Sequence, residues 1–159
     1  MKSNETHIFF WNGIYSNWYP AKFSYKGNEF ENSEQAFMWE KANFFGDYKI
    51  ANIVLENPEP RENKKLGRRV KNFNSFKWDQ VSKNFMYDVN KSKFEQNPGL
   101  KAQLLQTDGK DLVEASPYDK IWGIGMTEDD AVGVTPNEWL GKNYLGEVLT
   151  KLRKDLLNG

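Results

Sequence analysis

Between residues 32 and 46 the chain reads NSEQAFMWEKANFFG, and this stretch carries the strongest helix signal in the sequence. Asn32 precedes Gln35 by three residues, which is the spacing of a capping box at a helix N-terminus. Good helix formers follow as far as Phe45, and Gly46 is typical of the residue that ends a helix. The sequence therefore predicts a helix from Asn32 to Phe45.

Three side chains of this helix share one face. Glu34, Met38 and Lys41 are spaced by four and three residues, so the carboxyl and the amine project the same way about two turns apart. The structural alternative is that Glu34 only interacts favourably with the helix dipole and that Lys41 is a solvated cation. Spacing alone leaves both interpretations open.

The flanking sequence predicts more helices than strands. Runs 7–11 and 22–25 favour strands, with a loop rich in Gly, Asn and Pro between them and a turn at 26–28. Further strands are expected at 111–115 and 121–126, and further helices at about 47–56, 60–70, 78–96, 100–106 and 144–157. Because helices and strands do not alternate regularly, we expect an α+β fold, in which residues 1–159 form a single, mostly helical domain with a small mixed β-sheet.

The amino-acid composition limits the kinds of site that the chain can form. The 159 residues include 22 Lys and Arg against 22 Asp and Glu, one His and no Cys. Disulfides, thiolate metal sites and His clusters are excluded, so a metal, if present, would be held by oxygen ligands. We expect neither a metal nor a cofactor. The balanced charge argues against non-specific nucleic-acid binding. No apolar run is long enough to span a bilayer and the start lacks a secretory signal, which predicts a cytoplasmic protein without membrane contact.

Two further groups of side chains could carry chemistry. Asp119 and Trp122 lie at or near a predicted turn, where a carboxylate beside an aromatic ring can form a pocket mouth. The alternative is a plain hairpin, with an Asx-type bond at Asp119 and Trp122 packed in the core. Arg68 belongs to a basic run that is usually a solvated face, but its guanidinium could clamp a phosphate through two hydrogen bonds.

A set of motifs runs in order from about residue 9 to residue 153. It comprises Trp11-Asn12-Gly13, Ser16 to Ala21, Ser33 to Trp39 with Lys41-Ala42, Leu66-Gly67-Arg68, Lys93 to Pro98, Leu112 to Asp119, Ile121 to Gly125, and Trp139 to Asn143 with Leu145-Gly146. Together these motifs resemble the NADAR family, also described as YbiA-like. The collinear order is more specific than any single motif, and the main departure from the pattern lies between Trp78 and Asn90.

The resemblance implies a compact, mostly helical α+β domain that cleaves N-glycosidic bonds. Substrate classes known in the family are phosphoribosylamino-pyrimidine intermediates of riboflavin synthesis and ADP-ribose attached to guanine. The expected partner is therefore a small nucleotide-like molecule or ADP-ribosylated guanine in nucleic acid.

Cleaving a C1–N bond requires a proton for the departing base, charge stabilisation at C1 and a nucleophile. We expect Glu34 to act as general acid and base if burial raises its pKa, and Asp119 to stay ionised and orient the sugar. A Lys41 amine of lowered pKa could attack C1 and form a Schiff base, which we favour over direct attack by water.

The predicted binding residues are loop amides, hydroxyls and aromatic rings. Rings would stack on the base, polar groups would bind the sugar or the base edge, and an arginine would bind phosphate. The set comprises Trp11, Asn12, Ser16, Asn17, Trp39, Arg68, Ser116, Trp122 and Gly123. Two alternatives remain: a non-catalytic module that binds a nucleotide or ADP-ribose, and a structural interaction domain.

Overall fold

The computed structural model describes residues 1–159, and its seven helices and small sheets confirm the α+β class. The chain forms two units, each with its own internal contacts. Unit 1 comprises residues 1–16 and 99–159, and unit 2 comprises residues 17–98. No helix is both long and apolar enough to cross a membrane.

A three-stranded mixed sheet organises unit 1. The strands are β1 (Lys2–Ser3), β2 (His7–Phe10) and β5 (Asp111–Glu114), in the order β1-β2-β5. β2 pairs antiparallel with β1 and parallel with β5, where His7 lies opposite Asp111. The same unit contains α6 (Glu128–Ala131) and a short 3-10 helix (Pro136–Glu138). It also contains α5 (Pro98–Gln106) except for its first residue, because unit 1 resumes at Gly99. Its core includes Phe9, Val113, Ala115, Ile124 and Ala131.

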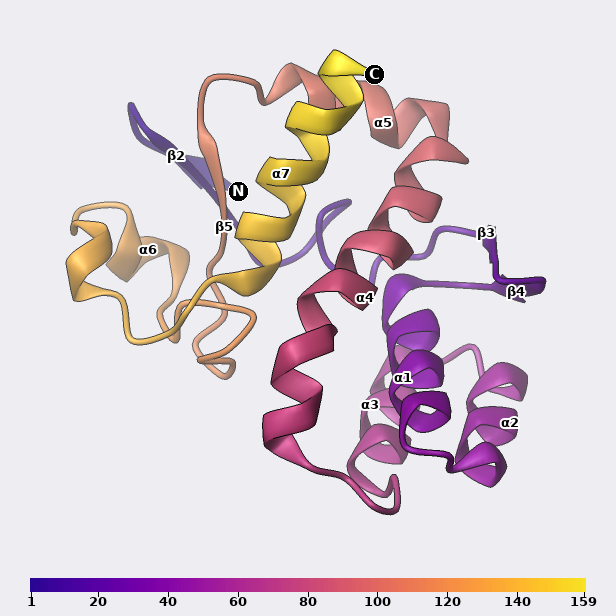
Figure 1. The fold of residues 1–159 in the computed structure, drawn as a ribbon. Helices are drawn as coiled ribbons and strands as arrows, with labels where there is room; N and C mark the ends of the chain where they lie inside the picture. The colour runs from indigo at the N-terminus through magenta and orange to yellow at the C-terminus, as the bar shows by residue number, and fades with distance from the viewer. The chain divides into compact units, whose positions relative to one another are not determined.

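The long C-terminal helix α7 (Tyr144–Asn158) packs along β5, and Figure 1 shows the two elements side by side. The Asn143 side chain accepts a hydrogen bond from the Glu114 N–H at 2.9 Å and donates one to the Leu112 carbonyl at 3.1 Å. The Thr150 hydroxyl oxygen accepts the Leu112 N–H at 3.0 Å. These bonds satisfy backbone groups at the outer edge of β5, so this edge is closed to strand pairing.

Close approach of α7 to β5 depends on Gly146. A Cβ at this position would overlap the Leu112 carbonyl oxygen and the Asn143 side-chain amide. We expect Gly146→Ala to lower the free energy of unfolding by about 2 kcal/mol or more, because backbone must shift to make room. Gly133→Ala is the matched control, since a Cβ at Gly133 has no neighbour within 4 Å. Urea denaturation of both variants tests this, and equal midpoints would contradict it.

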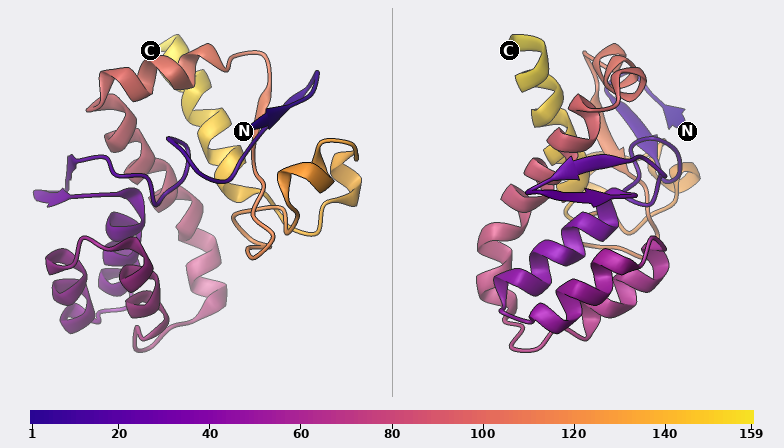
Figure 2. Two further views of the ribbon diagram at one scale, coloured as in Figure 1. Left: turned by 180° about the vertical axis from the view of Figure 1, so that it is seen from behind. Right: turned by 90° about the vertical axis from the view of Figure 1, so that its right-hand side faces the viewer.

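Unit 2 is a helical bundle joined to a hairpin. α1 (Ser33–Phe44) contacts three other helices, α2 (Tyr48–Glu56), α3 (Pro60–Arg68) and α4 (Ser75–Glu95). The hairpin strands β3 (Phe23–Tyr25) and β4 (Asn28–Phe30) contact α4 and α1, respectively, and are seen as paired arrows in the right view of Figure 2. The core of this unit includes Phe23, Tyr25, Phe30, Ala36 and Val89.

The start of α1 confirms the cap that the sequence predicts. The Asn32 side chain accepts the Gln35 N–H at 2.8 Å. The Gln35 side chain does not return to Asn32 but accepts the Glu31 N–H at 2.8 Å and donates to carbonyls at the end of α2, including Asn57 at 3.0 Å. These bonds fix the first turn of α1, which carries Glu34.

The strand predicted at 121–126 is wrong. This segment is irregular because Gly125 adopts a left-handed φ of 69°, and because its backbone bonds run to separate loops. The Ile124 N–H binds the Glu114 carbonyl at 3.0 Å, and the Ile124 carbonyl accepts the Leu140 N–H at 2.9 Å.

The other predicted elements are present with shifted ends. α4 begins at Ser75 rather than Trp78, because the Asn74 side chain caps it by accepting the Lys77 N–H at 2.9 Å. α5 begins at Pro98 rather than Leu100. The sequence did not predict β1, β4, α6 or the 3-10 helix, all of which have four residues or fewer.

Candidate active site

In unit 2, α1 brings an acid and an amine to one face, as their spacing predicts. Glu34 lies in the first turn of α1 and is 8% exposed. Its backbone N–H donates to the Asn17 carbonyl at 3.0 Å. The carboxylate acts electrostatically on Lys41 two turns along the helix. The Glu34 carboxylate and the Lys41 amine therefore interact electrostatically.

Lys41 lies in surroundings that favour its neutral form. Burial lowers the pKa of the Lys41 amine below its ordinary value, while the Glu34 charge raises it and the Arg68 charge lowers it. The amine also lies 4.6 Å from the centre of the Phe73 ring, a cation–π contact that favours the charged form and so opposes the effect of burial. A lysine whose pKa is lowered supplies more unprotonated amine at neutral pH, which is the form that can act as a nucleophile.

Close packing of α3 against α1 brings a third charge near the amine. A Cβ at Gly67 would overlap the Met38 sulfur, so a larger residue there would require the Met38 side chain to move. The next residue, Arg68, ends α3 with an exposed side chain. Its positive charge acts on Lys41 and remains accessible to an anionic ligand.

Two other predicted binding residues of unit 2 make internal contacts. The Asn17 side chain donates to the Met86 sulfur at 3.3 Å and accepts from the Asn90 amide at 3.5 Å. Trp39 lies on another face of α1, edge-to-face with Phe30 at a ring separation of 5.6 Å. The structure thus gathers Glu34, Lys41 and Arg68 but not the Trp39 ring.

The predicted residues of unit 1 form a second group around a tight loop. Asp119 Oδ1 accepts the backbone N–H groups of Ile121 and Trp122, both at 2.8 Å. The Ser116 hydroxyl oxygen accepts the Tyr118 N–H at 3.2 Å. The Asx-type bonds of the structural alternative are therefore present, although the hairpin is not. They hold the loop in one conformation.

This loop presents aromatic surface to solvent. Trp11 is 41% exposed and Tyr118 is 82% exposed, with their ring centres 5.8 Å apart. Trp122 is half-buried and lies edge-to-face with Tyr144 at 5.9 Å, so the exposed rings are those of Trp11 and Tyr118. Rings held exposed in this way can receive a flat ligand.

The remaining predicted residues of unit 1 are Gly123, Asn12 and Ser16, which lie in its loops. Gly123 is required by packing, because a Cβ there would lie 2.9 Å from the Asp119 carbonyl oxygen and 3.0 Å from that of Glu114. Asn12 is exposed, and the Ser16 N–H donates to the Gly13 carbonyl at 3.0 Å.

Sequence reasoning missed two notable side chains of unit 2. No spacing rule points to Phe73, which lies in the loop after α3. Lys93 is fully buried on α4, and burial lowers its pKa to about 7. Its spacing from Met86 and Val89 on one helix face was the signal that could have predicted this burial.

Residues 9–157 match the family described as NADAR domain. The chain belongs to the NADAR family. It is 44% identical over 147 residues to the N-glycosidase R617 of Acanthamoeba polyphaga mimivirus, covering 89% of this chain and 86% of that protein.

Two further comparisons extend the likeness. The protein irg-1 of Caenorhabditis elegans is 40% identical over 159 residues, covering 90% of this chain and 75% of irg-1. The NMR structure of the E. coli protein YbiA superposes with a TM-score of 0.80 at 28% identity, covering 99% of this chain and 88% of that one. The fold of YbiA is thus shared over nearly the whole chain.

Proposed function

We propose that this NADAR protein hydrolyses the C1–N bond between a ribose and a nucleobase-like group through a Schiff base on Lys41. The sugar is a phosphoribose or ADP-ribose. The enzyme class follows from the family, whose member R617 is named an N-glycosidase, so the chain is a hydrolase acting on N-glycosyl bonds. The observation that carries the mechanism is the partly buried Lys41 amine beside the charges of Glu34 and Arg68.

Lys41, Glu34 and water together account for every bond that forms or breaks in the proposed reaction. Lys41 Nζ attacks C1, the C1–N bond breaks, and Glu34 gives its proton to the departing base. The Glu34 carboxylate takes a proton from the attached amine and gives it to the ribose ring oxygen as the C1–O bond breaks, which leaves a protonated imine to the open-chain sugar. Water adds to the imine carbon, releases the sugar aldehyde and restores the amine. Glu34 is regenerated as an acid by the proton that this sequence releases.

The proposed roles in substrate binding follow from the functional group of each side chain. Arg68 is proposed to bind a phosphate, because its guanidinium is exposed and offers paired N–H donors. Asp119 is proposed to orient the sugar. The remaining predicted residues are proposed to hold the base and the sugar hydroxyls, namely Trp11, Asn12, Ser16, Asn17, Trp39, Ser116, Trp122 and Gly123. The family match spans both units, so we propose that residues 1–159 act as one domain.

A substrate screen tests the proposal. The protein is incubated with a riboflavin-pathway ribosylamino-pyrimidine, with ADP-ribosylated guanine free and in nucleic acid, and with NAD-derived molecules. Free base is then measured by chromatography and mass spectrometry. Release of base from one class supports the proposal and identifies the substrate. Saturable binding without base release would instead support a non-catalytic nucleotide or ADP-ribose binding module.

The reaction is expected to proceed without a divalent metal. Carboxylate and amine groups can carry every step above, and the chain has no Cys and one His to serve as the usual ligands. Activity measured after EDTA treatment should equal that of untreated protein. Complete loss in EDTA, restored by Mg²⁺, would contradict this expectation.

A further inference from the structure

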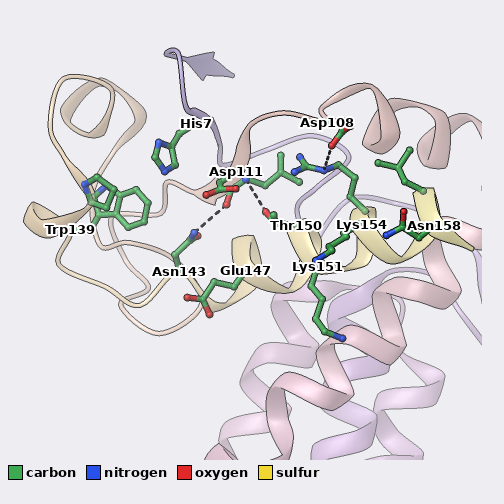
Figure 3. A pocket seen from close by; sticks show the side chains of 14 residues that line it. His7, Asp108, Asp111, Trp139, Asn143, Glu147, Thr150, Lys151, Lys154 and Asn158 are labelled. Atoms are coloured by element: carbon green, nitrogen blue, oxygen red, sulfur yellow. Dashed lines mark hydrogen bonds and ion pairs between the residues drawn. The ribbon is translucent and has the colours of Figure 1, made fainter.

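An open groove of about 970 Å³ lies within unit 1 and has no part in the proposed reaction. α7, the start of β5 and the segment around Trp139 form its walls (Figure 3). Its volume lies within the range of sites that hold small molecules. None of the residues assigned to catalysis or substrate binding lines it.

One end of the groove combines aromatic rings with carboxylates. His7 and Trp139 meet edge-to-face with ring centres 5.5 Å apart. Asp111 and Glu147 lie at the same end in Figure 3, and the exposed Asp111 carboxylate has no side-chain partner in the structure. Rings beside a carboxylate acceptor suit a flat heterocycle that carries N–H donors.

The other end is positive. Arg153 is only 6% exposed, and its Nη1 donates to the Thr107 carbonyl at 3.0 Å and the Lys110 carbonyl at 2.6 Å. The nearest acid is Asp108, whose Oδ1 lies 3.8 Å from Nε and whose side chain is 66% exposed. Lys154 adds a second cation without an ion-pair partner. Lys151 also lines the groove but pairs with Asp155 at 3.5 Å, so Arg153 and Lys154 face one solvated acid, which favours an anion at this end.

The distance between the two ends of the groove suits a small molecule that contacts both. Glu147 and Lys154 are seven residues apart on α7, which corresponds to about 10 Å along the helix. We propose that the groove binds a nucleoside monophosphate, with its base at the His7–Trp139 end and its phosphate at the Arg153–Lys154 end. A short zwitterionic peptide would match the charges, but the two rings favour a base.

Nuclear magnetic resonance titration of the whole chain tests this proposal. We expect AMP and CMP to give saturable shifts at the Trp139 indole N–H and at backbone amides 147–154, and adenosine or inorganic phosphate alone to bind at least tenfold more weakly. UMP should bind more weakly than CMP, because uracil lacks the exocyclic amine that would donate a hydrogen bond to the Asp111 carboxylate. Nucleotide bound at the proposed catalytic group gives a separate set of shifts around Lys41.

Two pairs of variants separate the groove from other sites. Lys154→Glu should raise the dissociation constant of AMP at least fivefold at low salt and leave any shifts around Lys41 unchanged. Asp111→Asn should remove the preference for CMP over UMP. Lys91→Glu and Asp79→Asn change exposed residues of α4 outside the groove and should alter neither value.

Three results would overturn the proposal. They are nucleotide shifts confined to the surroundings of Lys41, unchanged AMP affinity in Lys154→Glu, and groove shifts produced by triglycine but not by nucleotides. Base release is not measured, so failure here is distinct from failure of the proposed hydrolase activity.

Discussion

Lys41→Ala is expected to abolish base release, and borohydride added during turnover of the unaltered protein is expected to trap a sugar adduct on Lys41. The reason is that a covalent imine forms only on an unprotonated amine, and burial lowers the pKa of this one. Peptide mass spectrometry after reduction locates the adduct. Loss of the nucleophile removes the whole route rather than one favourable contact, so this is the largest effect that we expect.

Two lysine variants control this result. Lys41→Arg keeps a positive charge but supplies no usable amine, so it should also be inactive and untrapped. Lys91→Ala removes an exposed lysine of α4 and should retain both activity and trapping. An active Lys41→Arg protein without an adduct would make Lys41 an electrostatic or phosphate-binding residue. Water activated by Glu34 or Asp119 would then be the nucleophile.

The pH profile provides a second measurement on the same group. Activity that needs the neutral amine should rise with pH through the pKa of Lys41, which burial places below its ordinary value. Because the Arg68 charge lowers that pKa, Arg68→Ala should move the rising limb to higher pH. A limb that does not move would show that the rate does not depend on this amine.

Local signals determined what the sequence could predict. The residues that cap α1 and α2 act within three positions along the chain, so Asn32 and Asp47 locate both helix starts. The shared face of Glu34 and Lys41 follows from helical geometry alone. Each of these features depends on neighbours close in sequence, which is why pattern reasoning found them.

Features that depend on distant partners were not predictable. The 121–126 segment is apolar enough for a strand, but its Ile124 backbone groups bond to Glu114 and Leu140 instead. Gly67 and Gly146 matter because of Met38 on α1 and Leu112 on β5, respectively, which no local pattern reveals. The Phe73 ring reaches Lys41 from a loop after another helix. Tertiary packing decides all of these contacts.

Glu34→Gln is expected to lower turnover by roughly 10²-fold or more, with the folded structure retained. Glutamine keeps the shape of the side chain and some of its hydrogen bonding but cannot give a proton to the departing base. The variant also removes the charge that raises the pKa of Lys41, so that pKa should fall and the rising limb of the pH profile should move to lower pH. The remaining activity is therefore measured above that limb, where the amine is neutral in both proteins.

A matched acid separates catalysis from helix electrostatics in this experiment. Glu62 lies in the first turn of α3, as Glu34 does in α1, and is an exposed residue beside Lys65. Glu62→Gln should lose a comparable dipole interaction, worth about 0.3–1 kcal/mol of stability, without loss of turnover. Thermal unfolding and turnover are measured for both variants. If Glu34→Gln also keeps full turnover, Glu34 stabilises the start of α1, and the proton for the departing base must come from another group.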